Sequence, residues 1–598
     1  MKRNDILILV ALFALWLAWP MIDREIIKKH FYSSPSPAPA ETVVEPERPA
    51  AEPPSLAPAE NAEPAAPGPV AEPAAEPVPE TVATEPLRPE TTAVLEDERV
   101  RLVVSSRGAG LASAELKQYP LTAAPDSAPV VLDFSARRAL AYTDLAGLTE
   151  AGDFDLVSSS NNEVVLERTT PAGLQLRRTL QLEAGYVLKV TDRFANHGTQ
   201  AVVLPLHYLQ TGAMPGLPGE ATTRGLMNHG VDTLSPGGEG VKHWGNKLAR
   251  WFDEVKKEKG LSKTPVQIEW PLDTPMEWVA AKNKYFAQIL TPEGGAEKAV
   301  VLVRRVVSEA EQQKTGARIP PLAIESVSVA VQFVDFTLGP GDAFTRAMQY
   351  YIGPKKYDEL SRHGQHLVDV MEFGFWAPIG KLLLKVMNGI HRFLWPHSYG
   401  LAIILLTVLI RVVFWPITHK STESMRKMQE IQPLVAAVRK QYKDNAQKQQ
   451  QEIMALYKEH KVNPLGGCLP MLIQIPVFIA LFVVLRSAIE LRFASFLWIR
   501  DLSQPENLLA GMLPFGLSLN LLPILMAATM AWQQRLTPSG GDPNQQKMMM
   551  FMPIMMLVLF YNFASGLSLY WTTNQCLMIA QQLVAQRRKK AAAAAVAR

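Results

Sequence analysis

An arginine inside a long apolar run is the residue of this chain whose chemistry most needs an explanation. Between Ala402 and Trp415 the only polar side chains are Thr407 and Arg411. A charge at membrane depth costs about 2.5–3.5 kcal/mol, so it needs a reason. Two explanations stay open. The side chain extends to the nearby membrane surface, or it offers a charge in a water-filled cavity to an acidic group on a bound protein. Thr407, one helical turn away, then places a hydroxyl beside it.

The last apolar segment of the chain is unusually polar. Its polar stretch consists of Tyr570, Trp571, Thr572, Thr573, Asn574 and Gln575, and Gln581 and Gln582 follow. In a membrane span such residues face protein or water rather than lipid. Hydrogen bonds between helices and the wall of a wet groove both explain them. Residues of other apolar segments that fit the same groove are Gln474, Pro476, Gln533 and Gln534.

The sequence gives no support to enzymatic chemistry. It contains no P-loop, no GxGxxG and no nucleophile elbow, and we expect neither a metal nor a cofactor. Cys468 and Cys576 stand far apart and outside any CxxC motif. They are therefore expected to be two buried apolar side chains rather than a disulfide. The net charge of +3 is too small to indicate nucleic acid as a substrate.

Six apolar segments approach the length of about 20 residues that a membrane span needs. Five of them are 400–417, 465–485, 513–532, 548–563 and 567–585. The other, near the N-terminus, follows Lys2 and Arg3 and lacks a small-residue cleavage site, which favours an uncleaved anchor over a signal peptide. Lysines and arginines gather between the second and third spans and after the sixth, which predicts that both termini are cytoplasmic.

The basic segment between the second and third spans contains a helical pattern. It is nearly free of Gly and Pro, and its apolar residues recur at helical spacing, as at Met425, Met428 and Ile431. The segment is therefore predicted to form two helices that turn near 443–445. Two interpretations stay open. The segment is a solvated helical loop that only provides the excess of lysine and arginine typical of the cytoplasmic side, or it is a cytoplasmic hairpin whose adaptable methionine surface receives a substrate protein.

The first half of the chain differs in composition from the second. Residues 33–92 are rich in Pro, Ala and Glu and cannot bury enough apolar area to fold, so they predict an extended spacer. From about 95 to 345 apolar and polar residues alternate, as in 174–182, 187–194 and 327–336. This alternation predicts a large all-β domain of the sandwich type, which the orientation above places in the periplasm.

Two further segments carry helical expectations. The pattern of 343–360 predicts a helix that is interrupted at Gly353 and Pro354. Residues 372–394 combine aromatic and aliphatic side chains with Lys381, Lys385 and Arg392. That mixture is typical of an amphipathic helix on a membrane surface.

Several motifs resemble one known family. They include the run from Tyr457 to Phe478 with Asn463-Pro464-Leu465-Gly466-Gly467-Cys468-Leu469-Pro470 at its centre, Ile410-Arg411 with Phe414-Trp415-Pro416, and Gly566 to Trp571. These motifs resemble the YidC branch of the YidC/Oxa/Alb insertase family. The likeness is dense over about 370–585 and looser in the β region, at Lys282 to Phe286 and Tyr351 to Pro354.

The resemblance implies a membrane protein insertase of the bacterial inner membrane. It places Arg411 and Thr407 in a groove that is open to the cytoplasm and the lipid. It also implies a client-contacting slide formed by Ile475, Pro476, Tyr570 and Trp571. Because some relatives carry tyrosine at position 571, a role specific to a hydroxyl is doubtful there. The family acts alone or beside the Sec translocon without ATP, and its Gram-negative members carry a periplasmic β-supersandwich.

The sequence thus predicts a polytopic α-helical membrane protein with six transmembrane helices and an all-β periplasmic domain. The groove is expected to contain Arg411 with Thr407, Gln474, Gln533 and Thr573. Expected partners are nascent membrane-protein clients, the Sec translocon, the lipid bilayer, and ribosomes or targeting factors at the hairpin and the basic tail. The expected segments are 1–22 (anchor), 23–93 (linker), 94–350 (β domain), 351–398 (linking and interfacial helices), 399–417 (span), 418–464 (cytoplasmic hairpin), 465–487 (span), 488–512 (periplasmic loop), 513–532 (span), 533–547 (cytoplasmic loop), 548–563 (span), 567–585 (span) and 586–598 (basic tail).

Two other functions compete with insertion. A channel or transporter predicts inverted repeats or paired broken helices, and the spans contain none that we detect. A membrane-anchored envelope enzyme that acts on glycans predicts a pair of carboxylates in a cleft of the β domain, which the sequence alone leaves open.

Overall fold

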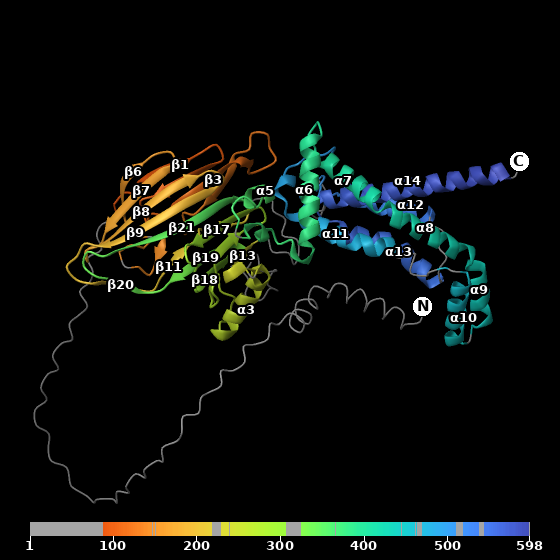
Figure 1. Ribbon diagram of the computed structural model, residues 1–598, viewed down its shortest axis with the longest axis horizontal. Helices are drawn as coiled ribbons and strands as arrows, with labels where there is room; N and C mark the ends of the chain where they lie inside the picture. Colours follow the sequence, from red (N-terminus) through yellow and green to blue (C-terminus); the bar gives the residue numbers. More distant parts are fainter. Residues whose placement is uncertain are drawn as a thin grey trace, which may run out of the picture. The chain divides into compact units, whose positions relative to one another are not determined.

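The computed structural model describes residues 88–596 except 146, 150, 218–228, 239, 307–323, 365, 444, 461, 463–468, 510–517 and 537–542. The expected N-terminal anchor lies outside the described residues, as do most of the Pro-rich linker and the motif from Asn463 to Cys468. The described chain comprises a region of antiparallel sheets followed by a region of helices (Figure 1).

The largest sheet has nine antiparallel strands. In spatial order they are β14 (Val241–His243), β13 (Gly230–Leu234), β16 (Trp278–Lys282), β17 (Phe286–Pro292), β21 (Ala343–Pro354), β9 (Val187–Asn196), β8 (Leu174–Glu183), β7 (Glu163–Thr169) and β6 (Asp155–Ser159). In β8 the leucines at 174, 176, 180 and 182 are buried while their neighbours face outward. This alternation is the reason the sequence forms a strand with one face in the core.

Three smaller sheets complete the β domain. One contains β15 (Gln267–Leu272), β18 (Lys298–Arg305), β19 (Ile324–Phe333), β11 (His207–Gln210) and β5 (Tyr142–Thr143), with β12 (Met214–Pro215) beside β19. Another contains β1 (Thr92–Glu96), β2 (Val100–Ser105), β3 (Leu111–Pro120) and β4 (Pro129–Asp133). The last pairs β10 (Val202–Leu204) with β20 (Phe336–Leu338). Leu102, Leu180 and Val329, from three different sheets, belong to one hydrophobic core.

Two local expectations for the β region were wrong. The segment 343–360, expected to be helical, forms strand β21 and only a short helix, α5 (Tyr357–Leu360). Pairing with both β9 and β17 stabilises β21 inside the nine-stranded sheet and overrides its local pattern. Conversely, α3 (Leu248–Glu258) is a helix that the alternation did not predict. It buries Trp251, whose ring stacks on Trp270 with centroids 5.2 Å apart.

A buried ion pair lies in the core of the β domain. Both side chains of Arg178 and Asp192, on neighbouring strands β8 and β9, are fully buried. Nε and Nη2 of Arg178 donate to the two carboxylate oxygens of Asp192, at 2.7 and 2.6 Å. The Tyr142 hydroxyl donates to the same carboxylate at 2.7 Å. The remaining guanidinium nitrogen donates to the carbonyls of Ala109 and Leu140, so the buried charges are hydrogen-bonded on all sides.

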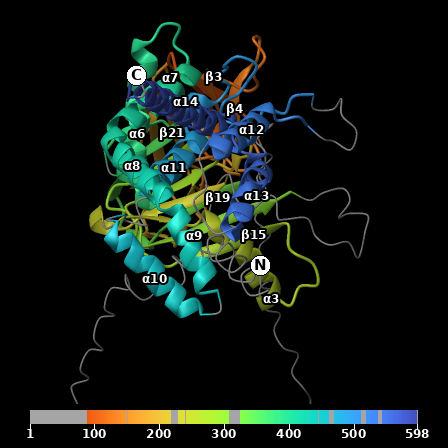
Figure 2. The same cartoon turned by 90° about the vertical axis from the view of Figure 1, so that its right-hand side faces the viewer.

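The second region is helical (Figures 1 and 2). Its helices are α6 (Ala377–Phe393), α7 (Tyr399–Val413), α8 (Trp415–Glu430), α9 (Gln432–Gln441), α10 (Ala446–Glu459), α11 (Leu469–Ser487), α12 (Leu521–Leu536), α13 (Pro543–Phe560) and α14 (Ser565–Val596). Helix α14 packs against α7 and α12, and α6 packs against α7 and α11. None of the described helices is both long enough and apolar enough to cross a membrane.

Two helices have ends that do not coincide with the bounds of the expected membrane spans. Helix α12 begins at Leu521 rather than at 513, because the Glu506 carboxylate accepts hydrogen bonds from the backbone N–H groups of Leu521 and Leu522 at its first turn. Helix α14 continues beyond 585 to Val596, through a basic and alanine-rich stretch that favours helix. Cys576, on α14, is exposed rather than buried, and Cys468 lies outside the described residues.

The segment between α11 and α12 joins the β domain to the helices. Arg492 donates to the carbonyls of Pro120 and Leu121, at 2.8 and 3.1 Å. The Ser503 hydroxyl lies 2.8 Å from that of Tyr285, in the turn before β17. One residue later, the carbonyl of Gln504 accepts hydrogen bonds from the backbone N–H and the hydroxyl of Ser565, the first residue of α14. The segment therefore contacts both a β-strand turn and the start of α14.

Candidate functional site

Arg411 points from the last turn of α7 toward α14. Its Nε donates to the side-chain oxygen of Asn574 at 2.8 Å, and its Nη2 lies 3.4 Å from the main-chain carbonyl oxygen of the same residue. Asn574 is buried. Among the residues that the structure describes, Asn574 is the one acceptor of hydrogen bonds from Arg411, and no carboxylate forms an ion pair with it. The guanidinium is thus held by a neutral side chain.

Thr407 shares the helix face of Arg411 but does not bond to it. Its hydroxyl donates to the carbonyl of Ile403 at 2.7 Å, one turn earlier in α7. The side chain is fully buried. Thr407 therefore lies one helical turn before Arg411, as its spacing predicts, and its hydroxyl proton forms a hydrogen bond to the backbone of the same helix.

The expected slide residues meet where α11 and α14 come together. The Gln474 amide donates to the Tyr570 hydroxyl, and Tyr570 is buried. The Trp571 ring packs edge-on against Phe478 of α11 with centroids 5.0 Å apart. Ile475, by contrast, is 42% exposed. The structure thus brings Gln474 and Tyr570 together and leaves an apolar side chain open beside them.

One face of α14 carries buried polar atoms without a hydrogen-bond partner among the described residues. They are Oγ of Ser568, Nε1 of Trp571 and Oε1 of Gln575. Positions 568, 571 and 575 follow the i, i+3, i+7 spacing of one helical face. Buried polar groups are normally paired, so this face is suited to contact with water or a polar group. Helical spacing in the polar run would have pointed to Ser568, which sequence reasoning missed.

Three other expected residues, two of the groove and one of the slide, lie on α14, α12 and α11. Thr573 and Gln533 are both partly buried, on α14 and near the end of α12. Pro476 is also partly buried and lies inside helix α11. The contacts described above connect none of the three to Arg411.

The basic segment 418–464 forms helices as expected near its turn. Helix α9 ends at Gln441 and α10 begins at Ala446, and the two helices pack together. Ile431 is buried, whereas Met428 is partly exposed. The side chain of Met425 lies outside the described residues. Of the two expected contact residues whose side chains the structure describes, Met428 is the one that is partly exposed.

A second charged cluster ties the segment before α6 to the β domain. Lys282 donates to Asp232, to Glu372 at 2.9 Å and to the carbonyl of Val370 at 3.0 Å. His243 Nδ1 lies 2.9 Å from Asp232 and 3.3 Å from Glu372. Asp232, His243 and Glu372 have the side chains of a metal site. The Lys282 ammonium, however, already binds both carboxylates, so we propose no metal there.

Acid should release this cluster. Burial alone would raise the pKa of Glu372, but the Lys282 and His243 charges outweigh it and lower the pKa from 4.5 to about 2. The ionised Glu372 therefore stabilises the fold fully above pH 4.5, and this contribution is lost as the pH falls through about 2. We expect Glu372→Gln to speed hydrogen exchange in 367–376 at neutral pH, with the difference from wild type vanishing toward pH 2.

The exposed pair of Arg304 and Glu325 supplies the control for this experiment. Glu325→Gln should leave exchange in 367–376 unchanged at every pH. A difference between wild type and Glu372→Gln that stays constant from pH 7 to pH 2 would contradict the assignment of the effect to Glu372 ionisation.

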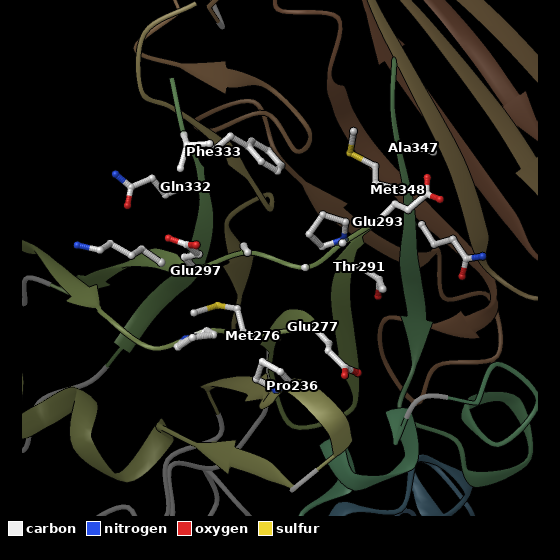
Figure 3. Close-up of a pocket in the computed structure, with 18 of the residues that line it drawn as sticks. Pro236, Met276, Glu277, Thr291, Glu293, Glu297, Gln332, Phe333, Ala347 and Met348 are labelled. Carbon is white, nitrogen blue, oxygen red and sulfur yellow. The ribbon is translucent and has the colours of Figure 1, made fainter. Parts of the chain in front are cut away.

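The β domain contains a pocket of about 1140 Å³ between the ends of β17 and β19 and the middle of β21 (Figure 3). Its apolar lining includes Met276, Phe333 and Met348. Its carboxylates come from Glu277, Glu293 and Glu297, which lie at different places around the pocket in Figure 3. Glu277 also accepts a hydrogen bond from the Gly237 N–H at 2.8 Å. Glycoside hydrolysis needs two carboxylates that flank one bond, and these three glutamates are the carboxylates that line this pocket.

Comparisons with known proteins agree with the motifs. Residues 92–386 match the family model described as the YidC periplasmic domain, and residues 390–592 match that of the 60Kd inner membrane protein. The membrane protein insertase YidC of Pelobacter propionicus is 34% identical over 490 residues, which cover 80% of this chain and 83% of that protein. The chain belongs to the YidC family. The resemblance recognised in the motifs is thereby confirmed, and the region that matches the periplasmic domain is mostly β-sheet.

One further relative and one solved structure cover a similar share of this chain. The membrane protein insertase YidC of Syntrophobacter fumaroxidans is 35% identical over 504 residues, covering 81% of this chain and 84% of that protein. A crystal structure described as an active YidC insertase with its first transmembrane domain resolved is 18% identical, with a TM-score of 0.33, and covers 83% of this chain and 93% of that one.

Proposed function

We propose that this protein inserts apolar segments of newly made proteins into the lipid bilayer of the bacterial inner membrane. The observation that carries the proposal is the Arg411–Asn574 contact between α7 and α14. It places a positive charge, without an ionic partner among the described residues, on the apolar helix α7 and against the polar run of α14. The unpaired polar atoms of Ser568, Trp571 and Gln575 nearby on α14 support a hydrated groove.

The proposed topology has six membrane spans, with both termini in the cytoplasm and the β domain in the periplasm. Large apolar side chains are exposed on the helices proposed to meet lipid. They are Leu405, Leu409, Val412 and Val413 on α7, Ile524 and Leu525 on α12, and Met550, Phe551, Ile554 and Val558 on α13. Exposed apolar surface of this extent indicates contact with a membrane or a partner. The lysines and arginines of 418–464 support a cytoplasmic location for that segment.

In the proposed mechanism, Arg411 attracts an acidic and hydrophilic part of a client into the groove. Two unit charges 4 Å apart attract by about 1 kcal/mol in bulk water and about 4 kcal/mol near a protein surface. That attraction recruits a client without trapping it. The apolar segment of the client then moves into lipid, which gains about 25 cal/mol for each Å² of apolar surface removed from water. No nucleotide is needed.

The exposed Ile475, beside the Gln474–Tyr570 contact, supports the α11–α14 surface as the slide along which the client leaves. The hairpin of α9 and α10 and the basic tail are the proposed contacts for ribosomes or targeting factors. Insertion by this protein alone and insertion beside the Sec translocon are both part of the proposal.

Reconstitution tests the proposed function. Purified protein in liposomes should insert a short single-span client made by in vitro translation, seen as protection of its span from added protease. Liposomes without the protein measure spontaneous insertion. The same vesicles should show neither enhanced flux of small solutes nor turnover of glycans. Insertion no faster than in empty liposomes would refute the proposal, and solute flux would favour a channel instead.

A further inference from the structure

We propose that Asn574 is a positioning residue that fixes the direction of the Arg411 guanidinium and keeps it charged and available to an acidic client. This inference rests on the proposed function, because it assigns a specificity role within the same groove. The contact of Asn574 is with Arg411, so we assign it a role that acts through the arginine rather than through direct contact with the client.

The pattern of hydrogen bonds defines which edge of the guanidinium stays available. Nε and Nη2 lie on the same edge, and both contact oxygens of Asn574. The other edge, between Nη1 and Nη2, has no acceptor among the described residues. A guanidinium edge with two parallel N–H groups matches a carboxylate bidentately. Asn574 therefore directs one edge of Arg411 into α14 and leaves the carboxylate-binding edge free.

The chemistry of an amide suits this role better than that of the residues around it. An amide oxygen accepts a hydrogen bond from Arg411 and does not cancel its charge, as a carboxylate at the same place would. Among the described residues Thr407 accepts no hydrogen bond from Arg411, and its hydroxyl donates to Ile403. Asn574 is itself buried, so its side chain has little freedom to turn away. A buried, neutral acceptor therefore fixes the position of the guanidinium and does not neutralise its charge.

Charge specificity distinguishes this role from a merely structural one. The experiment uses the full-length protein in liposomes and two clients that differ only in the tail, one with aspartates and one with asparagines at the same positions. Asn574→Asp should pair with Arg411 and slow insertion of the acidic client about tenfold or more, while the neutral client is inserted within about twofold of the wild-type rate. The neutral client also reports that the variant is folded.

Two further variants test positioning without adding charge. Asn574→Ala should slow the acidic client severalfold, because the guanidinium loses its acceptor, and Asn574→Gln should restore most of the rate by retaining the amide. Equal losses for both clients, or a wild-type rate of Asn574→Asp with the acidic client, would overturn the inference. Insertion by Arg411→Ala is measured in the same experiment. If Arg411→Ala inserts the acidic client at the wild-type rate, the proposed function fails. If Arg411→Ala inserts that client slowly and Asn574→Asp inserts it at the wild-type rate, only the role of Asn574 is refuted.

Discussion

Arg411→Ala is expected to slow the insertion of clients with acidic tails by about tenfold or more, and Arg411→Lys to retain most of the wild-type rate. Tenfold corresponds to about 1.4 kcal/mol, within the attraction of about 1–4 kcal/mol expected for two charges 4 Å apart. Lysine keeps the positive charge and loses only the bidentate geometry. Rates of protease protection in liposomes, measured with clients of matched length and graded tail charge, provide the test.

Accessibility of position 411 gives an independent check on the groove. A cysteine introduced at 411 should react with a membrane-impermeant thiol reagent added from the cytoplasmic side. Because Cys576 is exposed, the labelling needs a background in which Cys468 and Cys576 are both replaced by alanine. Failure of labelling from the cytoplasm, or wild-type rates of Arg411→Ala with acidic clients, would show that Arg411 is not a charge in a wet groove.

Arg178→Met is expected to destabilise the β domain by about 3–5 kcal/mol. The substitution leaves the carboxylate of Asp192 buried and without its cationic partner, and the loss of one partner of a buried ion pair has about this effect. It also leaves the carbonyls of Ala109 and Leu140 without their donor. Urea titration of the full-length protein, read by hydrogen exchange in β8 and β9, measures the change in the free energy of unfolding.

The neighbouring residue provides a matched control. Arg177, also on β8, pairs with Glu167, but the two side chains are 47% and 27% exposed. Surface ion pairs of this kind contribute at most about 1 kcal/mol. Arg177→Met should therefore change the free energy of unfolding by less than about 1 kcal/mol. Similar effects of the two substitutions would mean that burial does not determine the contribution of the Arg178–Asp192 pair.

The strands were predictable wherever one face of a strand is buried and the other exposed. The alternation in 174–182 and 187–194 corresponds to β8 and β9 because both strands obey that rule. Strand β21 was mistaken for a helix. Its last five residues are all buried, so their polarity does not alternate, and only pairing with two distant strands determines its structure. Helix α3 was missed because its buried face is formed by only four residues within a long β pattern.

The candidate site was predictable only in part. Arg411 stands out because a charge in an apolar run is costly, and this can be seen in a single segment. Its contact with Asn574 depends on how α7 and α14, separated by more than a hundred residues, pack together. The polar run of α14 contained Asn574, but sequence alone could not say which of its six polar positions faces the arginine. Likewise, the burial of Ile431 depends on the packing of neighbouring helices.

The segment between α11 and α12 acts as a mechanical linkage. Arg492 is attached to the end of β3, Ser503 contacts Tyr285 beside β17, and Gln504 is bonded to the first residue of α14. A rotation of the β domain must therefore break these bonds or pull on the start of α14. A displacement of the β domain, for instance on binding of a partner, would therefore be transmitted through these bonds to α14, the helix that carries Asn574, without any ligand entering the groove.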